Sequence, residues 1–201
     1  MILAIEGSPR KDGNSHTMLK AIVGGAREVG VPIQEVHLRD YRYESCVGCE
    51  QCRKDKICTK FHDGMTLLYP QIQEAKGLVL ISPVHNYNIT AWMKAFIDRL
   101  YCFYDFKKTR PRAWSSRLAG QGRKAVIGAI AEQADKKDMG FALEAMRLPL
   151  EAHGYEIVAE LPILQLFDRG IIAKHPELIE KARMAGRTLA QTVQADQRRL
   201  T

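Results

Sequence analysis

The chain has 201 residues, of which 46% are hydrophobic, and a formal net charge of +7. This length and composition predict one globular domain over residues 1–201 and exclude a disordered chain. No apolar run reaches the ~18 residues that span a bilayer. The first apolar stretch ends at Glu6, too early for a secretory signal, so we expect a cytoplasmic protein that binds no membrane. The positive charge suits an acidic protein partner or an anionic ligand, and no nucleic acid is expected because no nucleic-acid-binding motif is present.

The N-terminal stretch predicts a strand, a polar loop and the start of a helix. Residues 1–5 are apolar, whereas residues 7–17 are turn formers and hydrogen-bonding side chains. A loop of this kind before a helix N-terminus binds anions, because the first backbone N–H groups of the helix have no partner inside it. Candidate phosphate ligands are the side chains of Ser8, Arg10, Asn14, Ser15 and Thr17. An ordinary capped surface turn is the alternative interpretation.

The rest of the chain alternates between predicted strands and helices. Further strands are predicted at residues 33–38, 77–81, 124–130 and 155–161, and further helices at 63–74, 90–103, 139–153 and 176–194. Residues 39–62 are interpreted as a long loop, and residues 104–123 as a long basic segment with no assigned strand or helix. The alternation predicts a three-layer α/β fold with a parallel five-stranded sheet. Ligands of such sheets bind outside the carboxyl ends of the strands, so the site is expected at loops 7–15, 82–88 and 129–137.

Three motifs occur together in this chain. They are Gly-Ser-Pro-Arg at residues 7–10 with Gly-Asn-Ser at 13–15, Ser-Pro-Val-His-Asn-Tyr-Asn at 82–88, and Lys-Ala-Phe-Ile-Asp-Arg at 94–99. With this combination the chain resembles the flavodoxin-fold NADPH-dependent FMN reductase family, which includes quinone reductases and iron–sulfur flavoproteins. The resemblance implies the strand order 2-1-3-4-5, bound FMN, and assembly as a homodimer or homotetramer.

The resemblance also implies which residues contact FMN. The five candidate ligands of the first loop would hold its phosphate. The isoalloxazine ring would be lined by Pro83, Val84, His85, Asn86, Tyr87 and Asn88. The loop after the fourth strand would close the far side near Ala131 and Glu132. Two positions depart from the family pattern: Glu6, where a small or neutral residue is usual, and His85, where an aromatic residue is frequent.

Four cysteines in the loop at residues 39–62 have the spacing Cys-x2-Cys-x2-Cys-x5-Cys. Thiolates at such short spacings converge around one inorganic centre, as in bacterial ferredoxins. We therefore expect a [4Fe–4S] cluster, and the spacing also resembles that of the iron–sulfur flavoproteins. Its ligands would be Cys46, Cys49, Cys52 and Cys58. A zinc site and a set of unligated thiols are the alternatives. Cys102 lies in an apolar part of a predicted helix, so we expect it to be buried.

A flavin together with a cluster predicts an FMN-dependent oxidoreductase or electron-transfer flavoprotein. It would couple a one-electron donor to FMN and a small acceptor such as a quinone or an oxygen species. Basic residues near the cysteines suit an acidic, ferredoxin-like donor. The alternatives are a cluster-free NAD(P)H-dependent FMN or quinone reductase and a non-enzymatic electron carrier or redox sensor. The basic segment at residues 105–124 has four possible roles: a flavin cover, a subunit interface, a docking site or a solvated loop.

Overall fold

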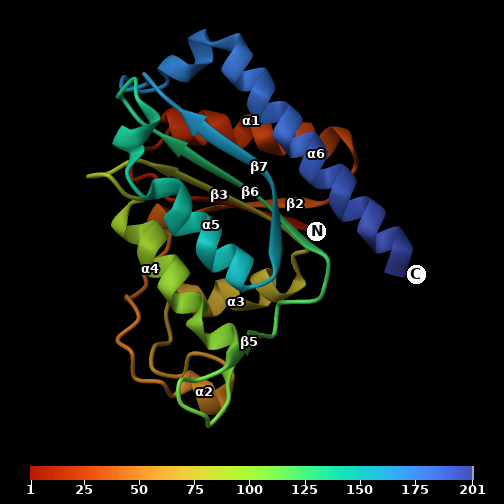
Figure 1. The fold of residues 1–201 in the computed structure, drawn as a ribbon. Helices are drawn as coiled ribbons and strands as arrows, with labels where there is room; N and C mark the ends of the chain where they lie inside the picture. Colours follow the sequence, from red (N-terminus) through yellow and green to blue (C-terminus); the bar gives the residue numbers. More distant parts are fainter. Residues whose placement is uncertain (201) are drawn as a thin grey trace.

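A five-stranded parallel sheet forms the centre of the computed structural model, which describes the backbone of residues 1–200 and the side chains of residues 1–196 (Figure 1). Its strands lie in the order β2-β1-β3-β6-β7, and neighbouring strands are parallel. Their bounds are Ile2–Glu6 for β1, Ile33–His37 for β2, Gly77–Pro83 for β3, Arg123–Ile130 for β6 and Tyr155–Ile163 for β7. Numbered among themselves, these strands have the order 2-1-3-4-5, so the predicted flavodoxin-like sheet is confirmed.

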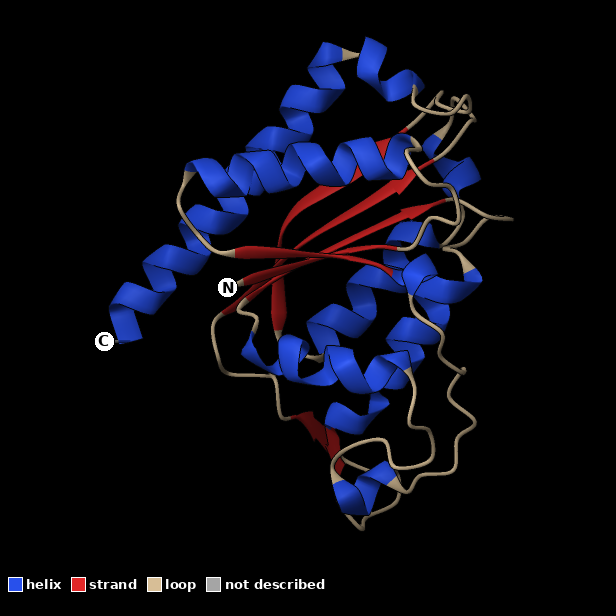
Figure 2. Cartoon of the chain, turned by 180° about the vertical axis from the view of Figure 1, so that it is seen from behind, coloured by secondary structure: helices blue, strands red, loops and turns tan. Residues whose placement is uncertain are grey.

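Helices cover both faces of the sheet and complete the three predicted layers (Figures 1 and 2). One face carries α1 (Asn14–Glu28) and α6 (Pro176–Leu200), and the other carries α3 (Gly64–Glu74), α4 (Ala91–Arg99) and α5 (Ala142–Ala152). Side chains alternate along a strand, so β1 directs Ile2 and Ala4 into one core and Leu3 and Ile5 into the other. Within the described part of the chain, no helix is long and apolar enough to cross a membrane.

Short helical turns modify some predicted boundaries. The helix predicted at residues 90–103 is α-helical only to Arg99 and continues as a 3₁₀ turn over Leu100–Phe103. The helix predicted from residue 139 begins at Ala142, after a 3₁₀ turn at Lys136–Met139. Further 3₁₀ turns lie at Leu38–Asp40 and Ile171–Lys174, and the cysteine loop contains the short helix α2 (Cys52–Asp55).

The basic segment contains structure that the sequence analysis missed. β4 (Tyr104–Phe106) and β5 (Trp114–Ser116) pair antiparallel and form a separate two-stranded hairpin. The sequence predicts no strand at residues 104–123, so the hairpin is a finding of the structure. Each strand has only three residues, too few for an alternating pattern to stand out, and the connection between them is rich in lysine and arginine.

Two glycines allow α1 and α6 to approach each other closely. A Cβ atom at Gly25 would lie 1.9 Å from the carbonyl oxygen of Arg183, and one at Gly186 would lie 2.0 Å from that of Ile22. Both distances are far shorter than any non-bonded contact, so the backbones of the two helices touch where they cross. The two helices together form one outer layer (Figure 1). The N-terminus of α1 lies at the carboxyl edge of the sheet.

Candidate functional site

A pocket of about 310 Å³ opens at the carboxyl ends of the parallel strands. It lies where the strand order reverses, between β1 and β3, which is the usual ligand position in such sheets. The loops after β1, β3, β6 and β7 all contribute to it. Its lining residues are Ser8, Pro9, Arg10, Gly13, Asn14, Ser15, Pro83, Val84, His85, Asn86, Tyr87, Ile130, Glu132, Gln133, Asp138, Leu166, Phe167 and Arg169.

Three expected FMN contacts do not line this pocket: Thr17, Asn88 and Ala131. The Thr17 hydroxyl donates to the carbonyl oxygen of Gly13 within the first turn of α1. The Asn88 side chain accepts from the backbone N–H of Ile89, and Ala131 is buried with its own N–H bonded to Ile163. These three residues shape the loops, whereas the other expected residues face the pocket.

The first loop has the features of an anion site. Gly13 is the N-cap of α1 and has no side chain to accept from the N–H groups of the first turn, which stay available to a ligand. The Ser8 hydroxyl accepts from the backbone N–H of Arg10 at 3.2 Å and so holds the loop in a tight turn. The loop is also anchored from behind, because the Thr90 hydroxyl donates to the carbonyl oxygen of Gly7 at 2.7 Å.

The loop after β7 is a part of the pocket that the sequence analysis missed. The Arg10 guanidinium lies 5.3 Å from the ring centroid of Phe167 and donates to its carbonyl oxygen at 3.3 Å. The Asn14 side chain donates to the carbonyl oxygen of Asp168 at 3.0 Å and accepts from the N–H of Ile172 at 3.1 Å. Asn14 therefore holds this loop in place. The rule that ligands lie beyond the strand ends applies equally to the fifth strand, and it would have indicated this loop.

The loop after β3 makes a tight turn at the pocket. His85 and Asn88 pair through their backbones, and the two residues between them, Asn86 and Tyr87, have φ angles of +48° and +63°. This left-handed conformation suits asparagine and is rare for tyrosine, and such strain is typical of functional loops. The carbonyl oxygen of Tyr87 accepts from the N–H of Phe141, which ties the turn to the start of α5 and leaves the Tyr87 ring exposed.

The four loop cysteines line one small cavity of about 30 Å³, with Phe61, Arg99 and Tyr101 among its walls. All four are free thiols, and they lie close enough to influence one another: burial, followed by the charges of Cys58, Cys46 and Cys49, raises the pKa of Cys52. Cys102 is buried as expected, and its burial raises its pKa to about 12.

The cysteine sulfurs do not form the compact group that a single ion needs. Among the described residues, one trio of metal-binding side chains has its donor atoms within 4.8 Å of one another, and it consists of Glu6, His16 and His37. A tetrahedral zinc with Zn–S bonds of about 2.3 Å holds its sulfurs about 3.8 Å apart. The cysteine loop is therefore more open than a structural zinc site.

Arg99 forms a buried ion pair with Asp63 and so joins the two ends of the cysteine loop. The Arg99 side chain, which is 1% exposed, donates to both carboxylate oxygens of Asp63 at 2.8 and 3.1 Å and to the carbonyl oxygen of Glu44 at 2.8 Å. Asp63 also caps α3 in a reciprocal capping box with Thr66. Burial raises the pKa of Asp63, but the hydrogen bonds and charge of Arg99, together with the backbone N–H groups of Glu44 and Met65, outweigh burial and lower the pKa.

The β4–β5 hairpin packs beside the cysteine loop, at the same end of the molecule as α2 (Figure 1). The Arg53 guanidinium lies 4.5 Å from the ring centroid of Phe106 and donates to the Tyr101 hydroxyl, and Lys56 pairs with Asp105. The connection between the two strands exposes Lys107, Lys108 and Arg110. No described lining residue of the large pocket comes from this hairpin, so its positive charge lies next to the cysteines.

Comparison with known proteins identifies the family of this chain. A model described as NADPH-dependent FMN reductase matches residues 1–154. An iron–sulfur flavoprotein of Archaeoglobus fulgidus is 37% identical over 98 residues, which are 49% of this chain and 44% of that protein. An iron–sulfur flavoprotein of Methanocaldococcus jannaschii is 29% identical over 135 residues, 67% of this chain and 63% of that protein. The chain thus matches only about half to two thirds of the length of these relatives.

Solved structures share the fold. The NAD(P)H:quinone oxidoreductase from Methanothermobacter marburgensis superposes with a TM-score of 0.70 at 19% sequence identity, and the match covers 94% of this chain and 98% of that one. An FMN-dependent NADH-azoreductase from Bacillus anthracis, solved in complex with FMN, has a TM-score of 0.62 at 14% identity and covers 100% and 99% of the two chains.

Proposed function

The chain belongs to the NADPH-dependent FMN reductase family, and on this premise we propose that it is an FMN-dependent oxidoreductase of the iron–sulfur flavoprotein branch. The observation that carries the proposal is the pocket at the strand ends, where the uncapped N-terminus of α1 meets the loops after β1, β3, β6 and β7. A helix N-terminus beside a polar loop suits a phosphate, and the adjoining wall formed by residues 83–87 suits a planar ring.

We assign the FMN contacts to residues that line this pocket. The first-turn N–H groups of α1, together with Ser15 and Arg10, would bind the phosphate, while Ser8 keeps the loop turned toward it. Pro83, Val84, His85, Asn86 and Tyr87 would line the isoalloxazine ring, and Glu132 would border the opposite side. When Arg10 binds a phosphate, its contacts with Phe167 allow the loop after β7 to stay closed beside the ligand.

A [4Fe–4S] cluster is the centre that we propose for Cys46, Cys49, Cys52 and Cys58. The four thiols border one cavity, as a shared centre requires, and their sulfurs are spread more widely than a single tetrahedral ion allows. A cluster is larger than one ion and holds its ligands further apart. Phe61 and Tyr101 would form part of its walls, whereas the Cys46 and Cys49 side of the loop is exposed to solvent.

The proposed electron donor is an acidic, ferredoxin-like one-electron carrier. FMN exchanges one or two electrons and a cluster exchanges one, so a protein with both couples a one-electron donor to a two-electron acceptor, here a quinone or an oxygen species. The exposed basic residues beside the cysteine loop supply a docking surface of the matching sign. NAD(P)H is the competing donor. We further propose that the protein is cytoplasmic, assembles as a homodimer or homotetramer, and binds neither nucleic acid nor membranes.

Anaerobic purification followed by flavin, iron and sulfide analysis tests the two cofactors. We expect FMN together with about four iron and four sulfide per chain. Cys46→Ser, Cys49→Ser, Cys52→Ser and Cys58→Ser should each lower the iron content after reconstitution, and Cys102→Ser is the matched control. Absence of FMN would refute the flavin assignment. Stoichiometric zinc without sulfide, or an equal dependence on Cys102, would refute the cluster.

Stopped-flow reduction tests the donor. The flavin absorbance is followed after mixing with NADPH, NADH or chemically reduced ferredoxin, and reduced ferredoxin should act fastest. Rapid reduction by NADPH with no advantage for ferredoxin would instead make the protein a plain flavin reductase. Turnover with a quinone then separates an enzyme from a carrier or sensor.

A further inference from the structure

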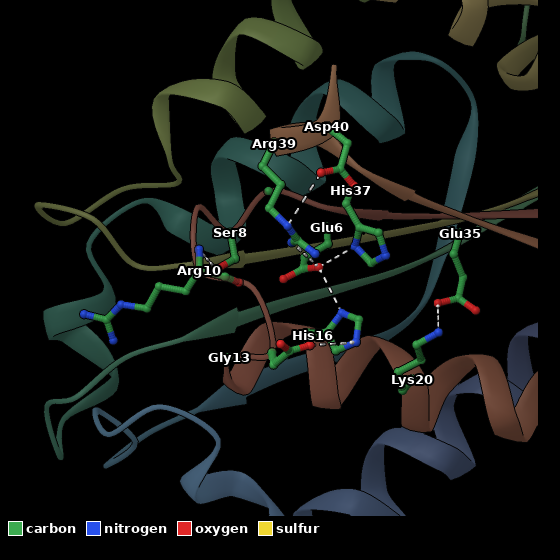
Figure 3. A network of polar contacts seen from close by, with 12 residues as sticks. Glu6, Ser8, Arg10, Gly13, His16, Lys20, Glu35, His37, Arg39 and Asp40 are labelled. Atoms are coloured by element: carbon green, nitrogen blue, oxygen red, sulfur yellow. Dashed lines mark hydrogen bonds and ion pairs between the residues drawn. The ribbon is translucent and has the colours of Figure 1, made fainter. Parts of the chain in front are cut away.

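A buried carboxylate and two imidazoles meet beside the first loop (Figure 3). Glu6 is fully buried at the end of β1, and His37 lies directly opposite it in the register with β2. His16 reaches the same place from the first turn of α1. The Nδ1 atoms of His37 and His16 lie 2.5 and 3.5 Å from Oε2 of Glu6, and the two ring centroids are 5.1 Å apart. Glu6 and His16 thus flank the first loop in the sequence, one at the end of β1 and the other at the start of α1.

Two buried atoms of this trio have no hydrogen-bond partner: Oε1 of Glu6 and Nδ1 of His16. The other nitrogen of His16, Nε2, lies 3.9 Å from the carboxylate of Asp12, beyond hydrogen-bond distance. An unpaired buried polar atom is costly, and a carboxylate oxygen and an imidazole nitrogen are both metal-ligand atoms, so a cation bound between them would satisfy both.

The surrounding charges also favour a cation. Arg39 donates to Oε2 of Glu6 at 2.9 Å and leaves Oε1 without a partner. Arg39 also lies 4.0 Å from Asp40, and Arg169 lies 3.5 Å from Asp12. The three carboxylates of Glu6, Asp12 and Asp40 thus lie near two guanidinium groups, which leaves one carboxylate of the cluster without a matching guanidinium. The cations of Arg10 and Lys20 do not compensate for it, because Arg10 is turned away and Lys20 pairs with Glu35 (Figure 3).

We propose that Glu6, His16 and His37 bind a divalent transition-metal ion, represented by Zn²⁺, and that Asp12 orients His16 from behind. Two imidazoles and one carboxylate are a ligand set for Zn²⁺ and its neighbours in the first transition series, and three protein ligands leave room for water. A carboxylate behind a ligating histidine is the usual second partner of such sites. None of the three ligands lines the large pocket in the described chain, so the site is separate from the flavin pocket. The bound ion would link β1, β2 and α1 and restrain the first loop.

Calorimetric titration with ZnCl₂ tests this proposal in the full chain without added flavin. Thiolates are zinc ligands, so the titration is repeated with Cys46, Cys49, Cys52 and Cys58 all replaced by serine. In that background we expect one ion per chain. His16→Ala and His37→Ala should each weaken binding by more than 100-fold, and Asp12→Asn should weaken it by about 10- to 100-fold. His175→Ala, which removes a surface imidazole beside Glu177, is the matched control and should bind normally.

Thermal unfolding supplies a second measurement. An ion that binds the native state raises the unfolding midpoint, so Zn²⁺ should stabilise the serine-substituted chain and not its His16→Ala derivative. His16 is partly exposed on α1, so this variant is expected to fold. Wild-type affinity in both histidine variants would overturn the proposal, and so would loss of all zinc binding on removal of the four loop thiols. In the serine-substituted chain, bound cobalt should give a histidine-dependent absorption band without thiolate charge transfer, and absence of this band would count against the site.

Discussion

Arg10 belongs to the anion-binding loop and at the same time contacts the loop after β7. We expect Arg10→Ala to weaken FMN binding by about 10- to 150-fold, because a hydrogen bond to a charged group contributes about 1.5–3 kcal/mol. Riboflavin has no phosphate, so its affinity should change little. Fluorescence titration with both flavins measures the difference, and Lys11→Ala, an exposed neighbour that does not line the pocket, is the control. An equal loss for FMN and riboflavin would show that Arg10 acts on the pocket as a whole.

Arg123 is the largest fully buried side chain of the described residues. Its guanidinium donates to the carbonyl oxygens of Ile72, Gln73 and Ala75 at the end of α3 and to the Tyr155 hydroxyl. Arg123→Met would leave these buried acceptors without donors. We expect the free energy of unfolding to fall by about 3 kcal/mol or more, as measured by urea denaturation.

Arg27→Met is the matched comparison for Arg123→Met. Arg27 is exposed and pairs with Glu35 at 3.2 Å on the surface, where an ion pair contributes about 1 kcal/mol or less. Arg123→Lys should restore only part of the lost stability, because one ammonium group cannot reach all of the acceptors that the planar guanidinium reaches. Similar stabilities of Arg123→Met and the wild type would contradict this account of the α3 terminus.

At the scale of the elements, His153 joins the end of α5 to the β4–β5 hairpin. The Ser116 hydroxyl and the Nδ1 atom of His153 share a hydrogen bond of 2.9 Å, and the imidazole stacks on Tyr104 with centroids 4.2 Å apart. Burial, and then the charge of Arg123, lowers the pKa of His153 to about 4. The imidazole is therefore neutral in the folded protein at neutral pH.

This pKa predicts an acid-sensitive link between α5 and the hairpin. Between the unfolded value of about 6.5 and the folded value of about 4, the unfolded state binds more protons, so stability falls as the pH falls. The contribution of His153 to this loss is at most about 3 kcal/mol. His153→Gln does not titrate, so the stability difference between wild type and variant should shift by that amount from pH 7 to pH 4 in urea denaturation. A constant difference across this range would refute the prediction.

Strands and helices with clear apolar patterns could be predicted from the sequence. Very short strands and contacts between residues far apart in the sequence could not. The five sheet strands are visible because each is an apolar or alternating run, as at residues 77–81. β4 and β5 were missed because three residues carry no periodic signal. The contact of Arg10 with Phe167 joins residues 157 positions apart, and the trio of Glu6, His16 and His37 depends on strand register, so local patterns reveal neither.

At the scale of the whole molecule, positive charge and cysteines lie together at one end. We expect Lys107→Glu with Lys108→Glu to slow reduction by reduced ferredoxin by about tenfold or more at low salt, because electrostatic attraction raises association rates by 10–10³. The effect should shrink as salt rises, since screening shortens the range of attraction. The matched control reverses two exposed charges of the opposite outer layer, Lys174 and Lys181. Stopped-flow rates that respond equally to both pairs would rule out docking at the hairpin.

The close approach of α1 and α6 at Gly25 and Gly186 restricts which amino acids the chain can accept during divergence. Because each glycine faces a carbonyl of the other helix, replacement of either one by alanine would force the whole outer layer apart. Gly186 lies outside residues 1–154, the part that matches the family model, whereas Gly25 lies inside it. A saturation library of the two positions should therefore return glycine at both, or paired changes that re-space the helices together. Glycine at both positions, or a paired change of the two, would then identify related sequences in which α6 packs on α1 in the same way, even where the rest of α6 is no longer similar in sequence.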